Sequence, residues 1–167
     1  MLRIDLAAVR EGPVETTAEL PADDPLVVGT GVALASPLVV SGRLSTAGEG
    51  KYYWQARLAT VVQAVCRRCL APVRVPIAPS LGVVFVDENE ASQDDDSYVV
   101  PRRATALDLS EAVREELILA VPQYVECRDD CRGLCPRCGA DLNLGPCGCQ
   151  PVVDPRWAAL TKLRKGG

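Results

Sequence analysis

Hydrophobic and polar residues alternate through the middle of the chain, which predicts β-strands across residues 37–86. The longest alternating run starts at Lys51 and has one face that is mostly apolar. The residues on that face are Tyr52, Trp54, Ala56, Leu58, Thr60, Val62 and Ala64. A period of two over this length predicts a long strand in an antiparallel sheet or a small open barrel. Shorter runs at 38–46, 73–77 and 81–86 predict its neighbours.

The pattern is weaker before residue 30. Residues 2–6 alternate between apolar and charged side chains, which predicts a short strand. The polar stretch 11–24 is interrupted by Pro13 and Pro21, and we expect it to form a loop.

A helix is predicted from Asp108 to the residue before Pro122. Asp108 and Glu111 have the spacing of a capping box, and four apolar residues then share one stripe. That stripe comprises Leu109, Val113, Leu117 and Ala120, and we expect it to cover the sheet.

A last helix is predicted from Asp154, with Pro155 at its first position. Its C-terminal end carries the cations Lys162, Arg164 and Lys165, which either complement the helix dipole or contact RNA or an acidic partner.

Together these elements predict an α+β protein in which a β-rich domain, 1–107, precedes a helical and cysteine-rich segment, 108–167. The acidic run 87–97 is expected to be a solvated, mobile loop within the first domain, because its like charges repel one another and few apolar residues are available to bury. We expect the second segment to pack on the first as one structural unit.

Composition narrows the possible functions. The chain has 167 residues, a net charge of −4 and no histidine, which excludes catalytic triads and any zinc site that uses imidazole. No apolar run reaches the roughly 18 residues of a membrane span, and no signal-peptide core is evident. We therefore expect a cytoplasmic protein with no membrane partner.

Cysteine is the most informative residue type. The chain contains Cys66, Cys69, Cys127, Cys131, Cys135, Cys138, Cys147 and Cys149. In a reducing compartment, clustered cysteines are metal ligands or redox groups rather than disulfides.

The last four cysteines predict a closed zinc site. Cys135 and Cys138 are separated by two residues and followed by Gly139, which is the pattern of a zinc knuckle. The nearest complementary pair is Cys147 and Cys149. Four thiolates complete the tetrahedron and leave no open position for catalysis, so we expect a structural ion.

The other four cysteines predict a second structural zinc site. Cys66 and Cys69 lie on a turn between two strands, and Cys127 and Cys131 follow the predicted helix, so one ion would tie the sheet to the chain beyond the helix. Two alternatives remain: Cys131 can join Cys135 and Cys138, or the pair Cys66 and Cys69 can act as a redox dithiol.

The ordered motifs resemble the YceD family, in a variant with a C-terminal cysteine cluster that not all members share. The resemblance rests on CRRCLAP at 66–72, DLSEAVREELILAVP at 108–122, CRGLCPRCGADLN at 131–143 and DPRWAAL at 154–160. It implies a non-enzymatic cytoplasmic factor in large ribosomal subunit biogenesis that supports accumulation of the large-subunit ribosomal RNA.

Basic residues gather near the cysteines and indicate how such a factor would bind. The candidate contacts for RNA or a partner are Arg67, Arg68, Arg74, Arg128, Arg132, Lys162, Arg164 and Lys165. The site formed by Cys66, Cys69, Cys127 and Cys131 would bring these basic stretches to one side, so we expect contact with ribosomal RNA phosphates on the pre-ribosomal large subunit. A basic ribosomal protein on the acidic region is the other candidate partner.

The sequence also bears on two other function classes. A thiol-based redox or zinc sensor is the alternative, because clustered thiolates can be oxidised with loss of metal. An enzyme is not expected, since the carboxylates of helix 108–121 point around its surface and no glycine-rich phosphate loop or open metal site accompanies them. We therefore expect no small-molecule substrate.

Overall fold

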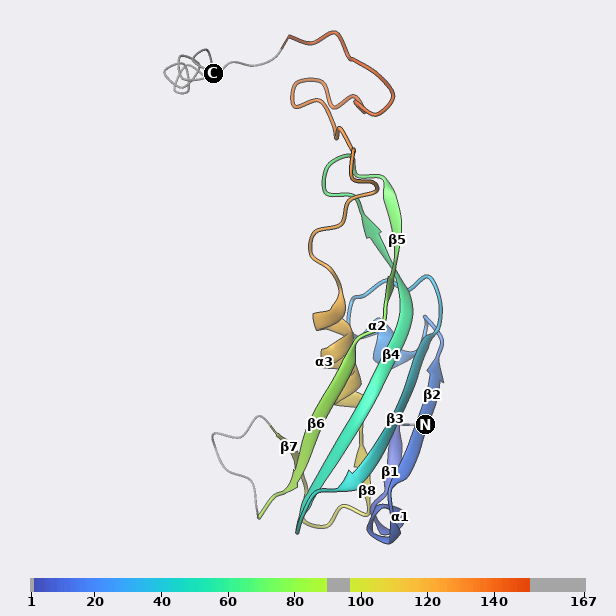
Figure 1. Cartoon of the computed structure of the whole chain (residues 1–167), viewed down its shortest axis with the longest axis vertical. Helices are drawn as coiled ribbons and strands as arrows, with labels where there is room; N and C mark the ends of the chain where they lie inside the picture. Colours follow the sequence, from blue (N-terminus) through green and yellow to red (C-terminus); the bar gives the residue numbers. More distant parts are fainter. Residues whose placement is uncertain (1, 90–96, 151–167) are drawn as a thin grey trace, which may run out of the picture.

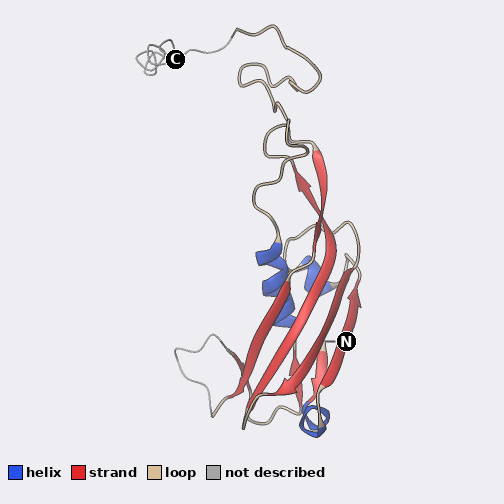
Figure 2. Cartoon of the chain, in the orientation of Figure 1, coloured by secondary structure: helices blue, strands red, loops and turns tan. Residues whose placement is uncertain are grey.

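The computed structural model describes residues 2–89 and 97–150 as an elongated molecule dominated by β-strands (Figures 1 and 2). The strands are β1 (Arg3–Asp5), β2 (Val14–Leu20), β3 (Leu38–Thr46), β4 (Lys51–Val65), β5 (Pro72–Ile77), β6 (Ser80–Asp87), β7 (Tyr98–Val100) and β8 (Ala106–Asp108). The helices are α1 (Leu6–Glu11), α2 (Pro25–Val28) and α3 (Ser110–Ala120). No helix within these ranges is both long and apolar enough to cross a membrane.

The main sheet is open and has the order β2-β3-β4-β6-β7, with β5 paired to the far end of β4. All its pairs are antiparallel except β6 with β7, so the expectation of an antiparallel sheet is correct in outline and the sheet is mixed in detail. A separate pair is formed by β1 and β8. The strand β4 is central because it pairs with β3 and β6 along its first part and with β5 along its second.

The alternation predicted along β4 is confirmed by burial. Tyr52, Trp54, Leu58 and Val62 are all buried on one face, whereas the intervening residues are mostly exposed. This face forms the core together with Leu109, Ala112, Val113 and Leu117 from α3 and the residue before it. The predicted helix is present as α3, but its start is not as predicted, because Leu109 is the N-cap and Asp108 and Glu111 do not form a capping box. The Asp108 carboxylate instead accepts a hydrogen bond from the Ser110 N–H.

The prediction of a loop across residues 11–24 is wrong. The segment holds the end of α1 and the whole of β2, which pairs with β3 along its full length. Thr16 of this strand is buried. The cost of burying its hydroxyl is offset by a 2.9 Å hydrogen bond that the hydroxyl accepts from the Trp54 indole N–H. The period of two was present, but small or polar residues such as Thr16 and Ala18 occupy its inward positions, and both prolines lie outside the strand.

Two other predictions fall mainly or wholly outside the described residues. These are most of the acidic loop 87–97 and all of the helix that begins at Asp154, with its basic residues Lys162, Arg164 and Lys165.

Candidate metal centres

The eight cysteines form two groups of four at one end of the molecule. The first group is Cys66, Cys69, Cys127 and Cys131, and the second is Cys135, Cys138, Cys147 and Cys149. Within each group the four sulfur atoms lie within 4.8 Å of one another. Both groups could therefore hold a metal ion, and they are the two sets that the sequence spacing predicted.

The first tetrad joins two distant parts of the chain. Cys66 and Cys69 lie on the turn between β4 and β5, which lies beside the segment after α3 in Figure 1. The Cys66 and Cys131 sulfurs are 3.8 Å apart, and the Cys69 and Cys127 sulfurs are 3.6 Å apart. A tetrahedron with metal–sulfur bonds of about 2.3 Å has edges of about 3.8 Å. The spacing therefore fits a single ion.

Backbone hydrogen bonds shape this turn as a knuckle. The Cys66 N–H donates to the Ala71 carbonyl at 2.8 Å, and the Leu70 N–H donates to the Cys66 carbonyl at 2.9 Å. Leu70 takes a positive φ of 61°, which is unusual for a residue with a side chain. Three of the four sulfurs are buried with Ala71, Val73 and Leu134 in a small apolar cluster that is separate from the main core.

The segment after α3 is also held to the turn by backbone contacts. The Arg67 N–H donates to the Val125 carbonyl at 2.8 Å, and the Leu134 N–H donates to the Arg68 carbonyl at 2.9 Å. Gly133 has a φ of +74°, and a Cβ atom there would lie only 2.9 Å from the Arg68 carbonyl oxygen. The close approach of the two segments therefore requires glycine at this position.

The second tetrad lies farther along the chain and is more open to solvent. Cys135 is buried, but Cys138 and Cys149 are exposed. Its first pair sits on a knuckle of the same design, in which the Gly139 N–H donates to the Cys135 carbonyl at 2.9 Å and Gly139 has a φ of +73°.

Asn143 connects the two tetrads and was missed by the sequence analysis. It lies between the cysteine pairs of the second tetrad, yet its side-chain amide donates to the Cys131 sulfur of the first at 3.6 Å. Its carbonyl oxygen accepts from the Arg132 N–H at 2.8 Å and from the Arg128 guanidinium at 2.9 Å. The position of Asn143 between two cysteine pairs was the only signal of this role in the sequence. Its hydrogen-bond partners could not be predicted, because they come together only when the chain folds.

Each tetrad contains one thiol that ionises easily and one that does not. Backbone N–H groups, chiefly that of Cys69, lower the pKa of Cys66 to about 6, and those of Cys138 and Arg137 lower the pKa of Cys135 to about 6. Burial and neighbouring thiols raise the pKa of Cys127 to about 12, and hydrogen bonding with Cys138 and Cys147 raises the pKa of Cys149 to about 12. Four thiolates can therefore coexist in a tetrad only when a cation compensates their charge.

The candidate arginines lie around the first tetrad, but three of them already have carboxylate partners. The Arg67 guanidinium is 2.6 Å from Glu126 and lies over the Tyr124 ring at 5.4 Å, and Arg68 is 3.9 Å from the same carboxylate. Arg128 is paired with Asp130 at 3.1 Å. The partners Glu126 and Tyr124 were not singled out from sequence, because their contacts form only in the folded chain.

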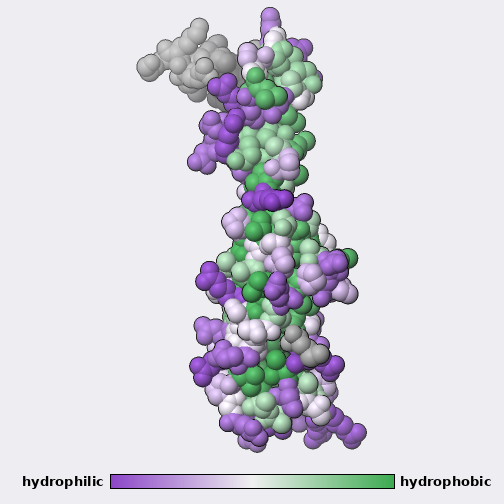
Figure 3. Space-filling model, turned by 90° about the vertical axis from the view of Figure 1, so that its right-hand side faces the viewer, coloured by the Kyte–Doolittle hydropathy of each residue, from purple (hydrophilic) through white to green (hydrophobic). Residues whose placement is uncertain are grey.

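The remaining described candidates, Arg74 and Arg132, are exposed. No carboxylate of the described ranges lies within 4.0 Å of the Arg74 or Arg132 guanidinium. Arg74 is on β5, opposite Gln63 of β4, and Arg132 directly follows Cys131. The structure thus places Arg67, Arg68, Arg128 and Arg132 on neighbouring segments at the cysteine-bearing end. Apolar surface also gathers there (Figure 3), where Leu70 and Leu144 are exposed.

Comparison with known proteins assigns the family. The model of the family described as large ribosomal RNA subunit accumulation protein YceD matches residues 54–164, which include both tetrads. The chain belongs to the YceD family. The resemblance stated from the four sequence motifs is thereby confirmed.

Individual relatives are moderately similar. An uncharacterized protein of Mycobacterium tuberculosis is 34% identical over 103 residues, which are 59% of this chain and 48% of the relative. A maize protein named large ribosomal RNA subunit accumulation protein YCED homolog 1, chloroplastic, is 26% identical over 152 residues, covering 73% of this chain and 52% of the relative. The uncharacterized protein YlbN of Bacillus subtilis is 28% identical over 133 residues, covering 78% and 76%.

The chain spans about half the length of the mycobacterial and maize relatives that it matches. No solved structure matches this chain.

Proposed function

We propose that this chain is a non-enzymatic, zinc-stabilised factor in large ribosomal subunit biogenesis, acting in the cytoplasm. Its family is named for accumulation of the large ribosomal RNA subunit. The observation that carries the proposal is the pair of all-cysteine tetrads, one of which ties the turn between β4 and β5 to the chain beyond α3. Such a tie builds a rigid binding surface from segments that the main core does not hold.

Zinc is the ion that this donor set favours. Four thiolates at tetrahedral spacing, with a local backbone knuckle, are typical of structural zinc, and iron is the main competitor for an all-sulfur site. A closed four-sulfur site leaves no position for water or substrate, which supports a structural role rather than catalysis.

Metal analysis of the purified protein tests this part directly. We expect two equivalents of zinc per chain, and one equivalent in Cys69→Ser or Cys149→Ser variants. Iron in place of zinc, or sulfurs joined as disulfides without metal, would overturn the zinc assignment.

We propose ribosomal RNA of the immature large subunit as the partner of the cysteine-bearing end. Arg67, Arg68, Arg128 and Arg132 are grouped on neighbouring segments there, and guanidinium groups are suited to phosphate contacts. Because Glu126 is bound by two of these arginines, RNA phosphates must compete with its carboxylate.

Binding to pre-ribosomal particles over a range of salt concentrations tests the RNA contact. Replacing Arg67 and Arg68 by glutamate should weaken binding and flatten its salt dependence, whereas Glu126→Gln should strengthen it. Arg43→Glu, which changes a distant arginine of β3, is the matched control. Unchanged affinity and salt dependence in the double variant would remove the RNA surface.

Complementation of a host strain that lacks the gene tests the biological role. The wild-type chain should restore the ratio of large- to small-subunit ribosomal RNA, and the Cys69→Ser variant should restore it less. A normal ratio in the deletion strain would refute the proposed role.

A redox or zinc sensor is the second candidate, favoured by the exposure of Cys138 and Cys149. Mild oxidation should then release zinc from the second tetrad reversibly and change the affinity for pre-ribosomal particles. Zinc release without a change in that affinity would leave the metal purely structural.

A further inference from the structure

Two exposed edges of the main sheet, at β2 and β5, contain residues of the kind that prevent another strand from pairing with a sheet edge. The edge strand β2 lies between Pro13 and Pro21 and directs two charged side chains, Glu15 and Glu19, to solvent. The edge strand β5 contains Pro72 and Pro76. Prolines and charges at an edge are the usual devices against strand addition.

The outer edge of β6 has unused backbone groups. The Leu58 N–H donates to the Pro79 carbonyl at 3.0 Å, and the antiparallel register continues from there along β4 and β6. Residues of an antiparallel pair alternate in the direction of their backbone groups. Odd-numbered residues of β6 therefore bond to β4, and even-numbered residues such as Gly82 and Val84 direct their N–H and carbonyl groups away from it.

Most of these groups are not taken up by a described strand. β7 pairs in parallel with β6 from Phe85 to Asp87, a register that engages the Val84 carbonyl, and no other strand within ranges 2–89 and 97–150 pairs with residues 80–84 on this side. Ser80, Gly82 and the N–H of Val84 therefore have no strand partner there. The sequence of this open stretch is Ser-Leu-Gly-Val-Val and contains neither proline nor charge. It differs in this respect from the edges at β2 and β5.

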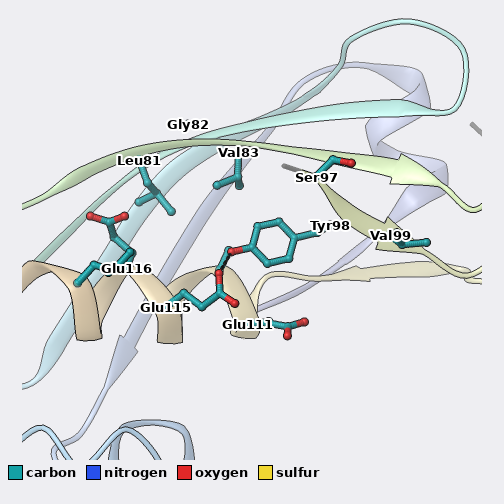
Figure 4. A pocket seen from close by; sticks show the side chains of 11 residues that line it. Leu81, Gly82, Val83, Ser97, Tyr98, Val99, Glu111, Glu115 and Glu116 are labelled. Atoms are coloured by element: carbon teal, nitrogen blue, oxygen red, sulfur yellow. Dashed lines mark hydrogen bonds between the residues drawn. The ribbon is translucent and has the colours of Figure 1, made fainter. Parts of the chain in front are cut away.

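A groove runs beside the open edge. It has a volume of about 730 Å³ and lies between β6, β7 and α3 (Figure 4). Leu81 and Val83 of β6 and Ala112 of α3 contribute apolar lining. An extended chain placed along the edge would therefore bond to β6 through its backbone and direct every second side chain into the groove, where a long side chain can pack its aliphatic stem against this lining.

The α3 side of the groove is acidic. Glu111, Glu115 and Glu116 line it, and no lysine or arginine of the described residues lies within 4.0 Å of their carboxylates. The Tyr98 hydroxyl donates a hydrogen bond to Glu115. Burial, together with the negative charge of these three glutamates, raises the pKa of Tyr98, which is consistent with a negative potential in the groove.

The spacing of these glutamates suits a strand. In Figure 4 α3 runs along β6, with Glu111 and Glu115 one helical turn apart. Residues four apart on a helix are separated by about 6 Å along its axis, and every second residue of a strand by about 6.7 Å. Alternate side chains of an added strand can thus meet successive carboxylates.

We propose that the outer edge of β6 and the facing glutamates of α3 bind an extended basic segment of another protein as an added strand. Backbone pairing with Gly82 and with the Val84 N–H supplies the register, and lysine or arginine at every second position pairs with the glutamates. Under the proposed function the natural source is a basic ribosomal protein, and only this identification of the source rests on that function.

The test uses a short capped peptide of alternating lysine and valine, labelled for fluorescence anisotropy, with the metal-loaded chain. We expect saturable binding that weakens with salt. A peptide of alternating glutamate and valine, and a lysine–valine peptide N-methylated at alternate residues, should not bind. Hydrogen exchange should slow at the Gly82 and Val84 amides when the first peptide is added.

Two protein variants separate backbone pairing from charge. Val84→Pro removes an outward N–H without touching the bonds to β4, and Glu111→Gln with Glu115→Gln removes groove charge. Each should weaken binding about tenfold, the effect of losing roughly 1.4 kcal/mol. Glu19→Gln, on the opposite edge of the sheet, is the matched control and should bind normally.

Three results would overturn the proposal. They are unchanged binding by a folded Val84→Pro variant, binding of the N-methylated peptide, and a dimer in light scattering that Val84→Pro converts to a monomer. The last would make a second copy of this chain the occupant. Zinc content and ribosomal RNA ratios do not depend on this peptide, so failure here is distinguishable from failure of the proposed function.

Discussion

Leu70 and Gly139 occupy equivalent positions in the two cysteine knuckles, directly after the second cysteine. Both have positive φ angles, 61° and 73°. A side chain costs about 1 kcal/mol or more in this conformation. Replacing it by glycine removes that cost, but the greater conformational freedom of glycine in the unfolded chain offsets part of the gain. Leu70 is 61% exposed, so its side chain loses little burial when removed.

Leu70→Gly should therefore stabilise the metal-loaded protein by about 0.5 to 1 kcal/mol, and Gly139→Ala should destabilise it by about 1 kcal/mol. No atom lies within 4 Å of a Cβ built at Gly139, so the second effect comes from the backbone alone. Urea unfolding with zinc present measures both. Destabilisation by Leu70→Gly would mean that the leucine side chain makes a favourable contact that outweighs its backbone strain.

Thr16 supplies the acceptor for the indole N–H of Trp54, and Trp54 is fully buried. Thr16→Val keeps the shape of the side chain but leaves that N–H without a partner, which costs about 1 to 3 kcal/mol. Thr17→Val, at an exposed neighbouring position of β2, should change the free energy of unfolding much less. Equal effects of the two substitutions in chemical denaturation would show that this hydrogen bond does not stabilise the fold.

At the scale of elements, the sequence predicted the strands and helices that have a clear hydrophobic pattern of their own. The strand β4 shows its period of two because one face is buried along most of its length, and α3 shows its apolar stripe for the same reason. The strands β7 and β8 are three residues long and exist through pairing with β6 and β1, so no local pattern predicts them. Both tetrads were predictable because each cysteine pair has the short spacing of metal ligands. The last two pairs are neighbours in the sequence, and the two pairs that remained then formed the other tetrad.

The knuckle turns also predict that metal binding by the tetrads depends on pH. A thiol whose pKa falls on folding contributes stability above its unfolded-state pKa of about 8.5. That contribution is lost as the pH falls through the folded value, which is about 6 for Cys66 and Cys135. Protons then compete directly with the ion for the sulfurs.

We therefore expect zinc content, measured after desalting at each pH, to fall between about pH 7 and pH 5, with the melting temperature falling in parallel. The melting temperature of a metal-free sample should change less over this interval. Full zinc occupancy retained well below pH 5 would contradict the proton competition.

At the scale of the whole molecule, two separate clusters hold the chain together. The main core contains Trp54, Leu58, Val113 and their neighbours, and it includes no cysteine. The second cluster consists of Cys66, Cys69 and Cys131 with a few apolar residues. The cysteine-bearing end extends beyond the sheet in Figure 1, so we expect ions in the two tetrads, together with the backbone hydrogen bonds from Arg67 and Leu134, to hold it in place.

Removal of the ions should consequently release one end of the molecule and leave the other folded. After treatment with a strong chelator under reducing conditions, amide exchange should accelerate in residues 66–72 and 125–150, while β3 and the first part of β4 stay protected. The first part of β4 is the internal control, because it belongs to the same strand that ends at Cys66 but packs in the main core. Mass spectrometry of proteolytic fragments resolves these regions. If chelation instead unfolded β3 and β4 cooperatively with the cysteine-bearing end, the ions would be stabilising the entire fold. The four arginines near the first tetrad and the groove beside β6 would then both lose their structure when the ions are removed.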